Sequence, residues 1–445
     1  MARKDDNTFT ETLYNYLTGD EDARVCKDIP ESACDDQPRN FSAYLAANFF
    51  SKLADEAASA KLILPWLFGA LGVPAFLTGF LVPIREGGVL LPQLAVAAIV
   101  RKVAVRKKVW VLGALLSAIS LLVMAYVALK LDGMEAGAAI LVMLLVFSVC
   151  RGLCSVSAKD VLGKTISKSR RGKLMGWSAS FSGIAVLILG LYLGGSHFQQ
   201  ADTLVFAGLL AFGGCVWIVA ALFFSSIIEQ PGATEGGGNA ISVALQQLSL
   251  LKSDPVFRQF VIARGLLLSV ALSPPFFVLA IQENVSGALL GLGTLIIANG
   301  LGTSLSAPFW GNMGDRSSKS VMIIAATSSA FIGVFTFLAI TNDWAWVINV
   351  YGFAAIFFIL NVMHGGVRLG RKVYLVDMAS ADNRAAYVAV SNTVIGVLML
   401  AGGLVGVVSD LLGAEVIILV LSCLSLVAAI YIRKLPDVSG GSEDG

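Results

Sequence analysis

The chain has 445 residues, of which 56% are apolar and only 14% are charged, and its mean hydropathy is +0.79. A soluble protein of this length needs more polar surface than such a composition supplies, so a water-soluble fold is excluded. The net charge of +2 gives no reason to expect a nucleic-acid partner. We therefore expect the lipid bilayer to be the main solvent of this chain.

Apolar segments of similar length follow one another through almost the whole chain. A bilayer core about 30 Å thick is crossed by about 20 helical residues, which is close to the length of these segments. The predicted fold is all-α and integral to the membrane. Its twelve transmembrane helices are expected at residues 44–70, 76–99, 109–129, 137–160, 174–195, 203–227, 257–281, 288–310, 320–340, 346–370, 386–407 and 416–432.

Lys and Arg residues are concentrated in alternate loops between these segments. The basic loops comprise residues 101–108, 164–173, 316–319 and 371–384, whereas the intervening loops contain acidic residues and almost no basic ones. Basic loops stay on the cytoplasmic side of a membrane. Both termini are therefore expected in the cytoplasm.

The N-terminal tail, residues 1–40, is polar and acidic and lacks the apolar stretch of a cleavable signal peptide. We expect the first span to direct insertion and the bacterial inner (plasma) membrane to be the host of this multi-pass protein. The composition of the tail is typical of a disordered segment. Docking of a protein partner is the alternative role for it.

The two halves of the chain resemble each other weakly. One constant shift along the chain places Gly152 on Gly365 and Arg151 on His364, and a long hydrophilic stretch at residues 229–255 separates the halves. This agreement indicates duplication of a six-helix unit. The predicted domains are an acidic cytoplasmic tail at 1–40, a six-helix bundle at 41–228, a cytoplasmic linker at 229–255, a second six-helix bundle at 256–434 and a cytoplasmic tail at 435–445.

Residues 311–319, between the eighth and ninth predicted spans, read Gly-Asn-Met-Gly-Asp-Arg-Ser-Ser-Lys. This stretch is similar to the loop signature of the major facilitator superfamily of transporters, in which a Gly is followed four residues later by Asp-Arg and then by a basic residue. The span count, the cytoplasmic termini and the long central loop also fit that family. The chain thus resembles the superfamily over essentially its whole length beyond the N-terminal tail.

The resemblance implies a gate at this loop, to which Gly311 belongs. Asp315 is expected to cap the N-terminus of a neighbouring helix, and Arg316 to pair with Asp377 at the foot of the tenth span. The corresponding stretch of the first half, residues 99–108, has neither Gly nor Asp. A symmetric gate is therefore not expected.

Several ionisable residues lie inside the predicted spans, where a charge is costly unless it faces water or a partner. Lys52, Asp55, Glu56 and Ser59 fall on one face of a helix, so this stripe can face a central cavity. Neutralisation of one of the two acids by Lys52 is the alternative. We expect Asp55, Glu56 or Glu86 to take up and release a proton.

Basic residues at similar depth are the candidates for contact with a solute. Arg85 lies next to Glu86 near the membrane midplane, and neighbours on a helix diverge by about 100°, so they do not simply neutralise each other. Arg151 and His364 occupy equivalent positions in the two halves, at the depth where the superfamily binds substrate. The alternative for Arg151 is an ion pair with an acid of the first span.

Uncharged polar residues inside the spans can complete the lining of such a site. Gln93, Asn361 and Asn392 are expected to contact the solute, and Asn299 is a further candidate. An interhelical hydrogen bond is the alternative for each of them. The ionisable residues inside spans that receive no role are Lys61 and Arg368.

Catalytic motifs are missing from the sequence: it contains no HExxH motif, no P-loop and no serine elbow, and it has only two histidines. We expect no enzymatic activity, no catalytic residue, no cofactor and no metal site. The predicted function is secondary active transport of a small anionic or zwitterionic organic solute by alternating access, with the proton as the coupling ion. The alternative is a non-transporting membrane receptor or assembly factor on the same scaffold.

Overall fold

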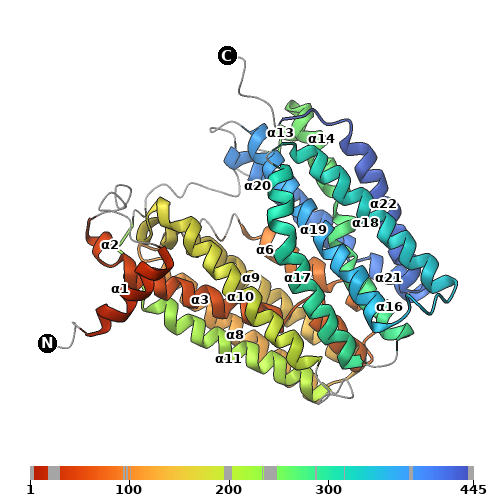
Figure 1. The fold of residues 1–445 in the computed structure, drawn as a ribbon, viewed down its shortest axis with the longest axis horizontal. Helices are drawn as coiled ribbons and strands as arrows, with labels where there is room; N and C mark the ends of the chain where they lie inside the picture. Colours follow the sequence, from red (N-terminus) through yellow and green to blue (C-terminus); the bar gives the residue numbers. More distant parts are fainter. Residues whose placement is uncertain are drawn as a thin grey trace.

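The computed structural model describes residues 5–18, 31–93, 96, 99–100, 102–194, 203–232, 234, 248–285, 288–314, 316–379 and 384–438. All regular secondary structure in these ranges is helical, and the helices form two bundles that diverge toward one side (Figure 1). Nine helical segments in the same ranges are long and apolar enough to cross a membrane. The predicted all-α membrane fold is therefore confirmed.

The first bundle contains the spans predicted in the first half of the chain. Its first span consists of two helices, and its second span begins with two more. The helices are α3 (Gln37–Ala57), α4 (Ile63–Ala70), α5 (Ala75–Thr78), α6 (Leu81–Leu90), α8 (Lys107–Lys130), α9 (Gly133–Thr165), α10 (Lys168–Leu193) and α11 (Thr203–Ser225).

The second bundle contains the spans predicted in the second half. Its first span is divided into three helices, and its fifth into two. The helices are α13 (Leu250–Ser253), α14 (Pro255–Leu266), α15 (Leu268–Leu272), α16 (Pro274–Asn284), α17 (Ala288–Gly314), α18 (Ser318–Thr341), α19 (Val350–Met378), α20 (Arg384–Gly402), α21 (Val405–Leu412) and α22 (Ala414–Ile432).

The first span of each bundle is interrupted within the membrane. Residues 58–62 separate α3 from α4, and there the N–H groups of Leu62 and Leu64 donate to the carbonyl of Ser59 at 3.3 and 3.0 Å. Ser273 separates α15 from α16 and precedes two prolines, which have no N–H group to donate to the preceding turn. Irregular backbone at membrane depth is tolerated where it lines a polar cavity. The break in the first span therefore marks a place where a polar site is expected.

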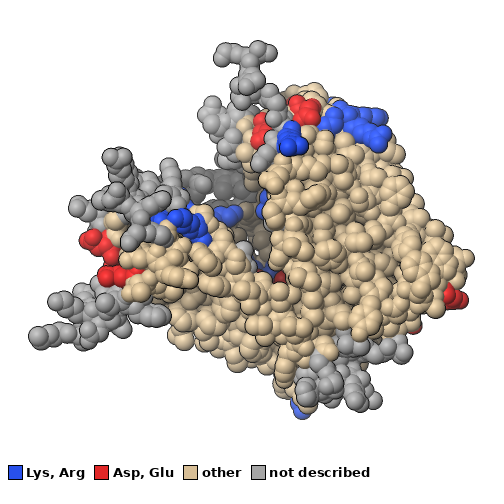
Figure 2. Space-filling model, in the orientation of Figure 1, with Lys and Arg blue, Asp and Glu red and all other residues tan. Residues whose placement is uncertain are grey.

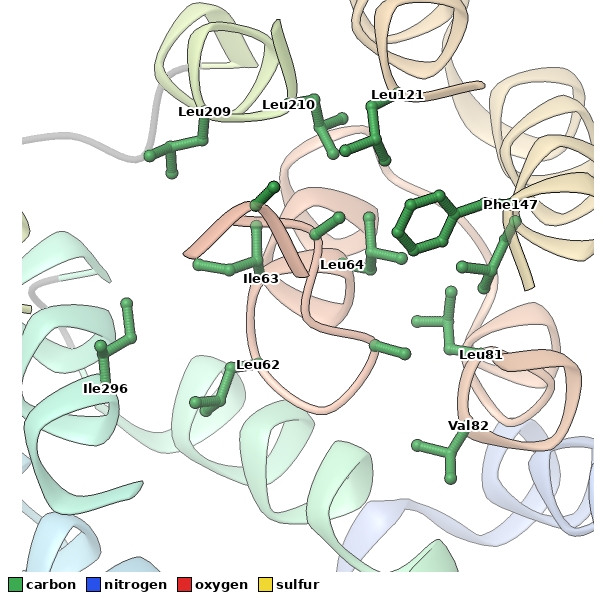
Figure 3. Packing of buried hydrophobic residues seen from close by; sticks show 14 of the residues in the cluster. Leu62, Ile63, Leu64, Leu81, Val82, Leu121, Phe147, Leu209, Leu210 and Ile296 are labelled. Atoms are coloured by element: carbon green, nitrogen blue, oxygen red, sulfur yellow. The ribbon is translucent and has the colours of Figure 1, made fainter. Parts of the chain in front are cut away.

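The residues that follow this break anchor it in the apolar core of the first bundle. Leu64 lies beside Phe147 and close to Leu121 (Figure 3). The side chains of Leu62, Ile63, Leu64, Leu121 and Phe147 are each at most 1% exposed. Because lipid is as apolar as these side chains, close packing contributes more to their stability than exclusion of water does. The break is thus held by tight packing on one side while its other side is free to face a polar site.

The two bundles meet through glycine backbones at the ends that lie away from α1 and from the end of α22. A Cβ atom on Gly79 would lie 2.5 Å from the Cα atom of Gly406, and a Cβ atom on Gly293 would collide with Gly194. Only glycine allows two backbones to approach so closely. These contacts bring α5 against α21 and α10 against α17 and close this end of the interface.

The opposite ends of the bundles are separated by a hollow. Figure 2 shows this hollow between the two bundles, with Lys and Arg side chains in its walls. It opens on the side where α1 and the end of α22 lie (Figure 1), which is the side that the basic loops predict to be cytoplasmic. The bundles are thus in contact at one end and apart at the other.

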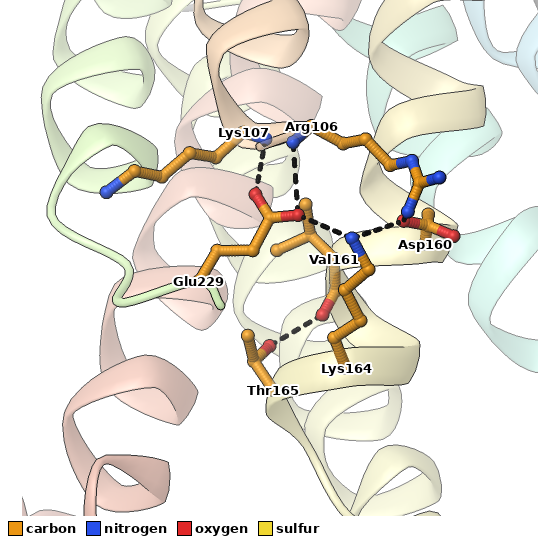
Figure 4. A network of polar contacts seen from close by, with 7 residues as sticks. All are labelled: Arg106, Lys107, Asp160, Val161, Lys164, Thr165 and Glu229. Carbon is orange, nitrogen blue, oxygen red and sulfur yellow. Dashed lines mark hydrogen bonds and ion pairs between the residues drawn. The ribbon is translucent and has the colours of Figure 1, made fainter. Parts of the chain in front are cut away.

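A buried carboxylate fixes the start of the central linker on this same side (Figure 4). Glu229, whose side chain is 0% exposed, accepts hydrogen bonds from the backbone N–H groups of Arg106 and Lys107 at 3.0 and 2.6 Å and from Lys164 Nζ at 3.0 Å. Asp160 pairs with Arg106 at 2.7 Å and with Lys164 at 3.1 Å. Glu229 therefore caps the N-terminus of α8, a role for which the loop at 99–108 has no acid of its own.

The N-terminal tail is more ordered than the sequence predicts. Residues 5–18 form α1 (Asp5–Thr18), followed by α2 (Glu31–Asp35), and Tyr14 and Leu17 of α1 are buried on the first bundle. Arg170 and Trp177 donate to the last carbonyls of α1, at 2.7 and 2.9 Å. The expected disorder is therefore wrong for residues 5–18, because two apolar side chains one turn apart and a satisfied C-terminus outweigh the acidic composition. Residues 19–30, like residues 235–247 of the linker, lie outside the described ranges.

Candidate binding cavity

A cavity of about 430 Å³ lies between the two bundles where the hollow ends. It is lined by the break between α3 and α4 and by α3, α6, α9, α17 and α19, so both bundles contribute to it. Its polar lining residues are Asp55, Glu56, Ser59, Lys61, Arg85, Glu86, Arg151 and Ser155 from the first bundle and Asn299, Thr303, Asn361, His364 and Arg368 from the second.

Asp55 is held by two arginines from different helices. Arg151 on α9 donates to Asp55 Oδ2 from Nη2 at 2.7 Å and from Nε at 3.1 Å, and Arg85 Nη2 on α6 lies 3.4 Å from Asp55 Oδ1. The three side chains are only 18 to 20% exposed. Charge-assisted contacts in such a confined place are among the stronger hydrogen bonds in proteins. The ion pair considered as the alternative role of Arg151 is therefore present.

Aromatic rings support both guanidinium groups from behind. The Arg85 guanidinium lies 5.0 Å from the centroid of the Phe147 ring, and that of Arg151 lies 4.7 Å from the centroid of Trp217. A cation over an aromatic face is stabilised by the ring quadrupole, and more so when water is largely excluded. The rings therefore fix the two cations without using a second carboxylate.

Lys61 links the two bundles across the cavity. It lies at the break between α3 and α4, and its Nζ atom is 3.2 Å from Nε2 of His364 on α19. A lysine ammonium group only donates, so Nε2 accepts this hydrogen bond and a neutral imidazole ring then carries its proton on Nδ1. The contact joins a residue of the first bundle to a residue of the second at the depth of the cavity.

Three other charged side chains line the cavity without an ion pair. Within the described ranges, no ion pair joins Glu56, Glu86 or Arg368 to any other residue. Arg368 follows His364 by one helical turn, which places both on the same face of α19. Sequence reasoning left Lys61 and Arg368 without a role, although the turn spacing from His364 was a usable signal for Arg368.

Gln93 and Asn392 do not line the cavity. Asn392 Nδ2 donates to Gln93 Oε1 at 3.2 Å, and Arg264 Nη2 donates to Asn392 Oδ1 at 2.8 Å. Arg264 Nη1 also donates to Ser391 Oγ at 2.7 Å. These contacts are hydrogen bonds between helices, including one between the bundles, as the alternative reading of both residues expects. Asn361 does line the cavity, and its Nδ2 atom donates to the carbonyl of Phe357 in its own helix at 2.8 Å.

The residues assigned to the gate lie where α17 turns into α18. Gly311 is in the last turn of α17, and a Cβ atom there would meet nothing within 4 Å. Asp315 lies outside the described residues. Arg316 and Asp377 are both described and exposed, and no ion pair joins them. Their pairing stays a prediction.

A metal centre has no obvious place in the described part of the chain. No group of three or more His, Cys, Asp and Glu side chains in these ranges is arranged to hold a metal ion. The cavity instead combines separate carboxylates with separate cations, a set of groups suited to binding a charged organic solute.

Comparison with known proteins agrees with this architecture. The family model described as Major Facilitator Superfamily matches residues 266–444, which cover the second bundle from the end of α14 onward. No curated protein sequence matches the chain. Solved structures with a similar fold are found over most of its length.

One of them is the nucleoside transporter NupG, with a TM-score of 0.68, 15% identity and coverage of 89% of this chain and 99% of that one. The inward open conformation of the xylose transporter XylE from E. coli has a TM-score of 0.66 and 15% identity, covering 90% of this chain and 98% of that one. A POT family transporter in complex with 5-aminolevulinic acid has a TM-score of 0.69 and 13% identity, covering 92% and 98%.

Identities this low establish the shared fold alone. The fold nevertheless extends over both bundles, and the family model independently matches the second. The chain therefore has the fold of these solved transporters, and most of its second bundle matches the Major Facilitator Superfamily model.

Proposed function

We propose that the protein is a secondary active transporter that moves a small anionic or zwitterionic organic solute by alternating access, coupled to protons. The observation that carries this proposal is the cavity between the bundles. Charged side chains of both signs line it, and they come from both bundles. The cavity lies between the hollow on the open side and the glycine contacts at the closed end. Solute sites of transporters with repeated bundles lie at such an interface.

Asp55 is the acid best placed to couple a proton to solute movement. Protonation of Asp55 would remove the negative charge that holds Arg85 and Arg151, and would free both guanidinium groups for an acidic solute. Binding of the solute to these cations would in turn favour protonation of Asp55, because coupling between two sites is reciprocal. Glu56 and Glu86 are the further candidates for carrying a proton.

The proposed solute contacts come from both bundles. Arg85 and Arg151 face the cavity from α6 and α9, while Asn361 and His364 face it from α19. A solute that contacts both faces gains differential affinity for a state in which the bundles are closer, and this is what drives a conformational change. The neighbour bound to 5-aminolevulinic acid, a molecule with an amine and a carboxylate, supports a charged solute.

The receptor hypothesis is weaker than transport. It uses the acidic tail as a docking arm, but Tyr14 and Leu17 of that tail are buried on their own bundle. We keep the cytoplasmic position of both termini and the bacterial inner membrane as parts of the proposal, on the strength of the basic loops.

A thermal-shift screen of the purified protein tests the proposed function. The panel contains organic anions, amino acids, sugars, nucleosides and drugs, each at pH 5.5 and pH 7.5. We expect stabilisation by one chemical class, with different strength at the two pH values, and loss of that stabilisation in Arg151→Ala. Stabilisation by no class at either pH would contradict the proposal.

A further inference from the structure

The cations that line the cavity fall into two groups. Arg85 and Arg151 share Asp55 as their counter-charge. Lys61 and Arg368, in contrast, form no ion pair with any residue in the described part of the chain. Acidic side chains lie near these two cations, but no carboxylate is within ion-pair distance of either one, so an acidic group of a ligand can contact both directly.

The two unpaired cations belong to different bundles and face the same space. The hydrogen bond from Lys61 to His364 brings the ammonium group to α19, and Arg368 follows His364 by one turn on that helix. Lys61 and Arg368 are close enough for their charges to repel each other. An acidic group placed between them would replace this repulsion by two attractive contacts.

Two unpaired carboxylates lie beside these cations. Glu56 and Glu86 line the cavity, lie within electrostatic range of Lys61 and form no ion pair in the described ranges. A carboxylate only accepts hydrogen bonds, so these two groups are suited to an ammonium group of a ligand. The cavity thus offers groups of both signs that a ligand carrying both charges can contact at once.

We propose that Lys61 and Arg368 together bind the acidic group of the solute across the two bundles, and that Glu56 and Glu86 receive its amine. The solute is then a zwitterion with an amine and a carboxylate, such as an amino acid or a short peptide. This assignment rests on the proposed function and deepens it: while Asp55 is ionised and holds Arg85 and Arg151, Lys61 and Arg368 are the cavity cations left to bind the acidic group. An acid that bridges Lys61 and Arg368 also draws the bundles together on the open side.

Binding measurements on the purified full-length chain test the assignment. The probes are free L-amino acids and dipeptides, their methyl esters, which lack the negative charge, and their N-acetyl derivatives, which lack the positive charge. We expect the free zwitterion to stabilise the protein most. Its affinity should fall roughly tenfold or more in Lys61→Gln and in Arg368→Gln, because each variant loses one charge-assisted contact.

Matched variants separate binding from folding. Lys52→Gln removes a cation of the same span that does not line the cavity, and it should bind like the wild type. Arg368→Lys keeps the charge and should recover part of the affinity. The assignment is overturned if no zwitterion binds, if the esters bind as well as the free acids, or if both Gln variants bind like the wild type.

Uptake into proteoliposomes distinguishes failure of this assignment from failure of the proposed function. Uptake of a neutral sugar or nucleoside at a rate that Lys61→Gln and Arg368→Gln do not change would overturn the assignment. The proposed transport function would still hold. A zwitterion that binds as expected but never crosses the membrane would support the site and overturn transport.

Discussion

The interface between the two bundles has two regions built from different chemistry. At the closed end, Gly79 meets Gly406 and Gly194 meets Gly293 through their backbones. At the cavity, the interface is lined by charged side chains, of which Lys61 and His364 make contact across it. Contacts between glycine backbones can separate without leaving a charge unpaired, whereas rearrangement at the cavity must move charges. The glycine contacts can therefore separate without an electrostatic penalty. The charges at the cavity are suited to control when this separation occurs.

The largest effect is expected from loss of the charge at Asp55. The Asp55→Asn substitution removes the carboxylate that contacts both Arg85 and Arg151 in a confined place, so it should destabilise the protein by about 3–5 kcal/mol. A fall in the thermal midpoint in detergent measures this. Asp160→Asn is the matched control, because that side chain is 39% exposed and its ion pairs should contribute about 1 kcal/mol or less.

Partial recovery in the double variant Asp55→Asn with Arg151→Gln would sharpen the result, since it removes one of the two cations that lose this contact. Equal thermal midpoints for Asp55→Asn and Asp160→Asn would contradict this expectation. They would show that the ion pairs of Asp55 contribute no more to stability than those of the more exposed Asp160.

A smaller effect is expected at the glycine contacts. Gly406→Val places a side chain where the backbone of α5 now lies, and overpacking of this kind costs about 1–3 kcal/mol. Only the state with this end closed has that cost, so the population should shift toward the state with this end open, by roughly fivefold to 150-fold. Distances between spin labels on the two bundles measure the shift.

Gly208→Val on α11 is the control for the glycine contacts. A Cβ atom at Gly208 would meet nothing within 4 Å, so the label distances should stay as in the wild type. Unchanged distances in Gly406→Val as well would refute the idea that glycine contacts close this end.

The smallest effect is expected within the second bundle, away from the interface regions. Asp254 caps α14 and accepts hydrogen bonds from the N–H group of Phe257 at 2.9 Å and from the hydroxyl of Tyr387. Burial alone would raise the pKa of this carboxyl, but the hydrogen bonds from Tyr387 and from the backbone of Phe257 and Val256 outweigh burial and lower the pKa. The carboxyl therefore contributes stability above its unfolded pKa of about 3.9, and this contribution is lost as the pH falls through its folded pKa.

Asp254→Ala should therefore lower the stability by about 1 kcal/mol at neutral pH, as is usual for loss of an N-cap. The thermal midpoints of the variant and the wild type should converge as the pH falls below about 3.9. The label distances between bundles should not change, since this contact lies within one bundle. A difference in midpoint that persists unchanged at low pH would contradict the role of the ionised carboxyl.

The broad fold and part of the cavity were accessible from the sequence because charge inside an apolar span is conspicuous. Asp55, Glu56, Glu86, Arg151 and His364 are such charges, and the structure brings all five to one cavity. Their depth along a span follows from counting residues. Their partners do not, since Arg85 reaches Asp55 on another helix although Glu86 is its neighbour in sequence.

Other features depend on contacts that no local pattern reveals. The break at residues 58–62 contains no proline, so nothing in the sequence announces that Lys61 leaves the helix and reaches α19. Gln93 and Asn392 are polar inside spans like the cavity residues, yet they satisfy each other at 3.2 Å. The capping of α8 by Glu229 joins residues more than a hundred positions apart.

Concentrative uptake is the most direct test of alternating access through this cavity. The protein is reconstituted into proteoliposomes, a pH gradient is imposed with the acid side outside, and accumulation of the solute that gives the largest thermal stabilisation is followed. Proton-coupled alternating access predicts that the wild type accumulates the solute above its external concentration. A protonophore should abolish this accumulation, and Asp55→Asn should show none. A solute that binds in the cavity but never rises above its external concentration in wild-type vesicles would contradict it.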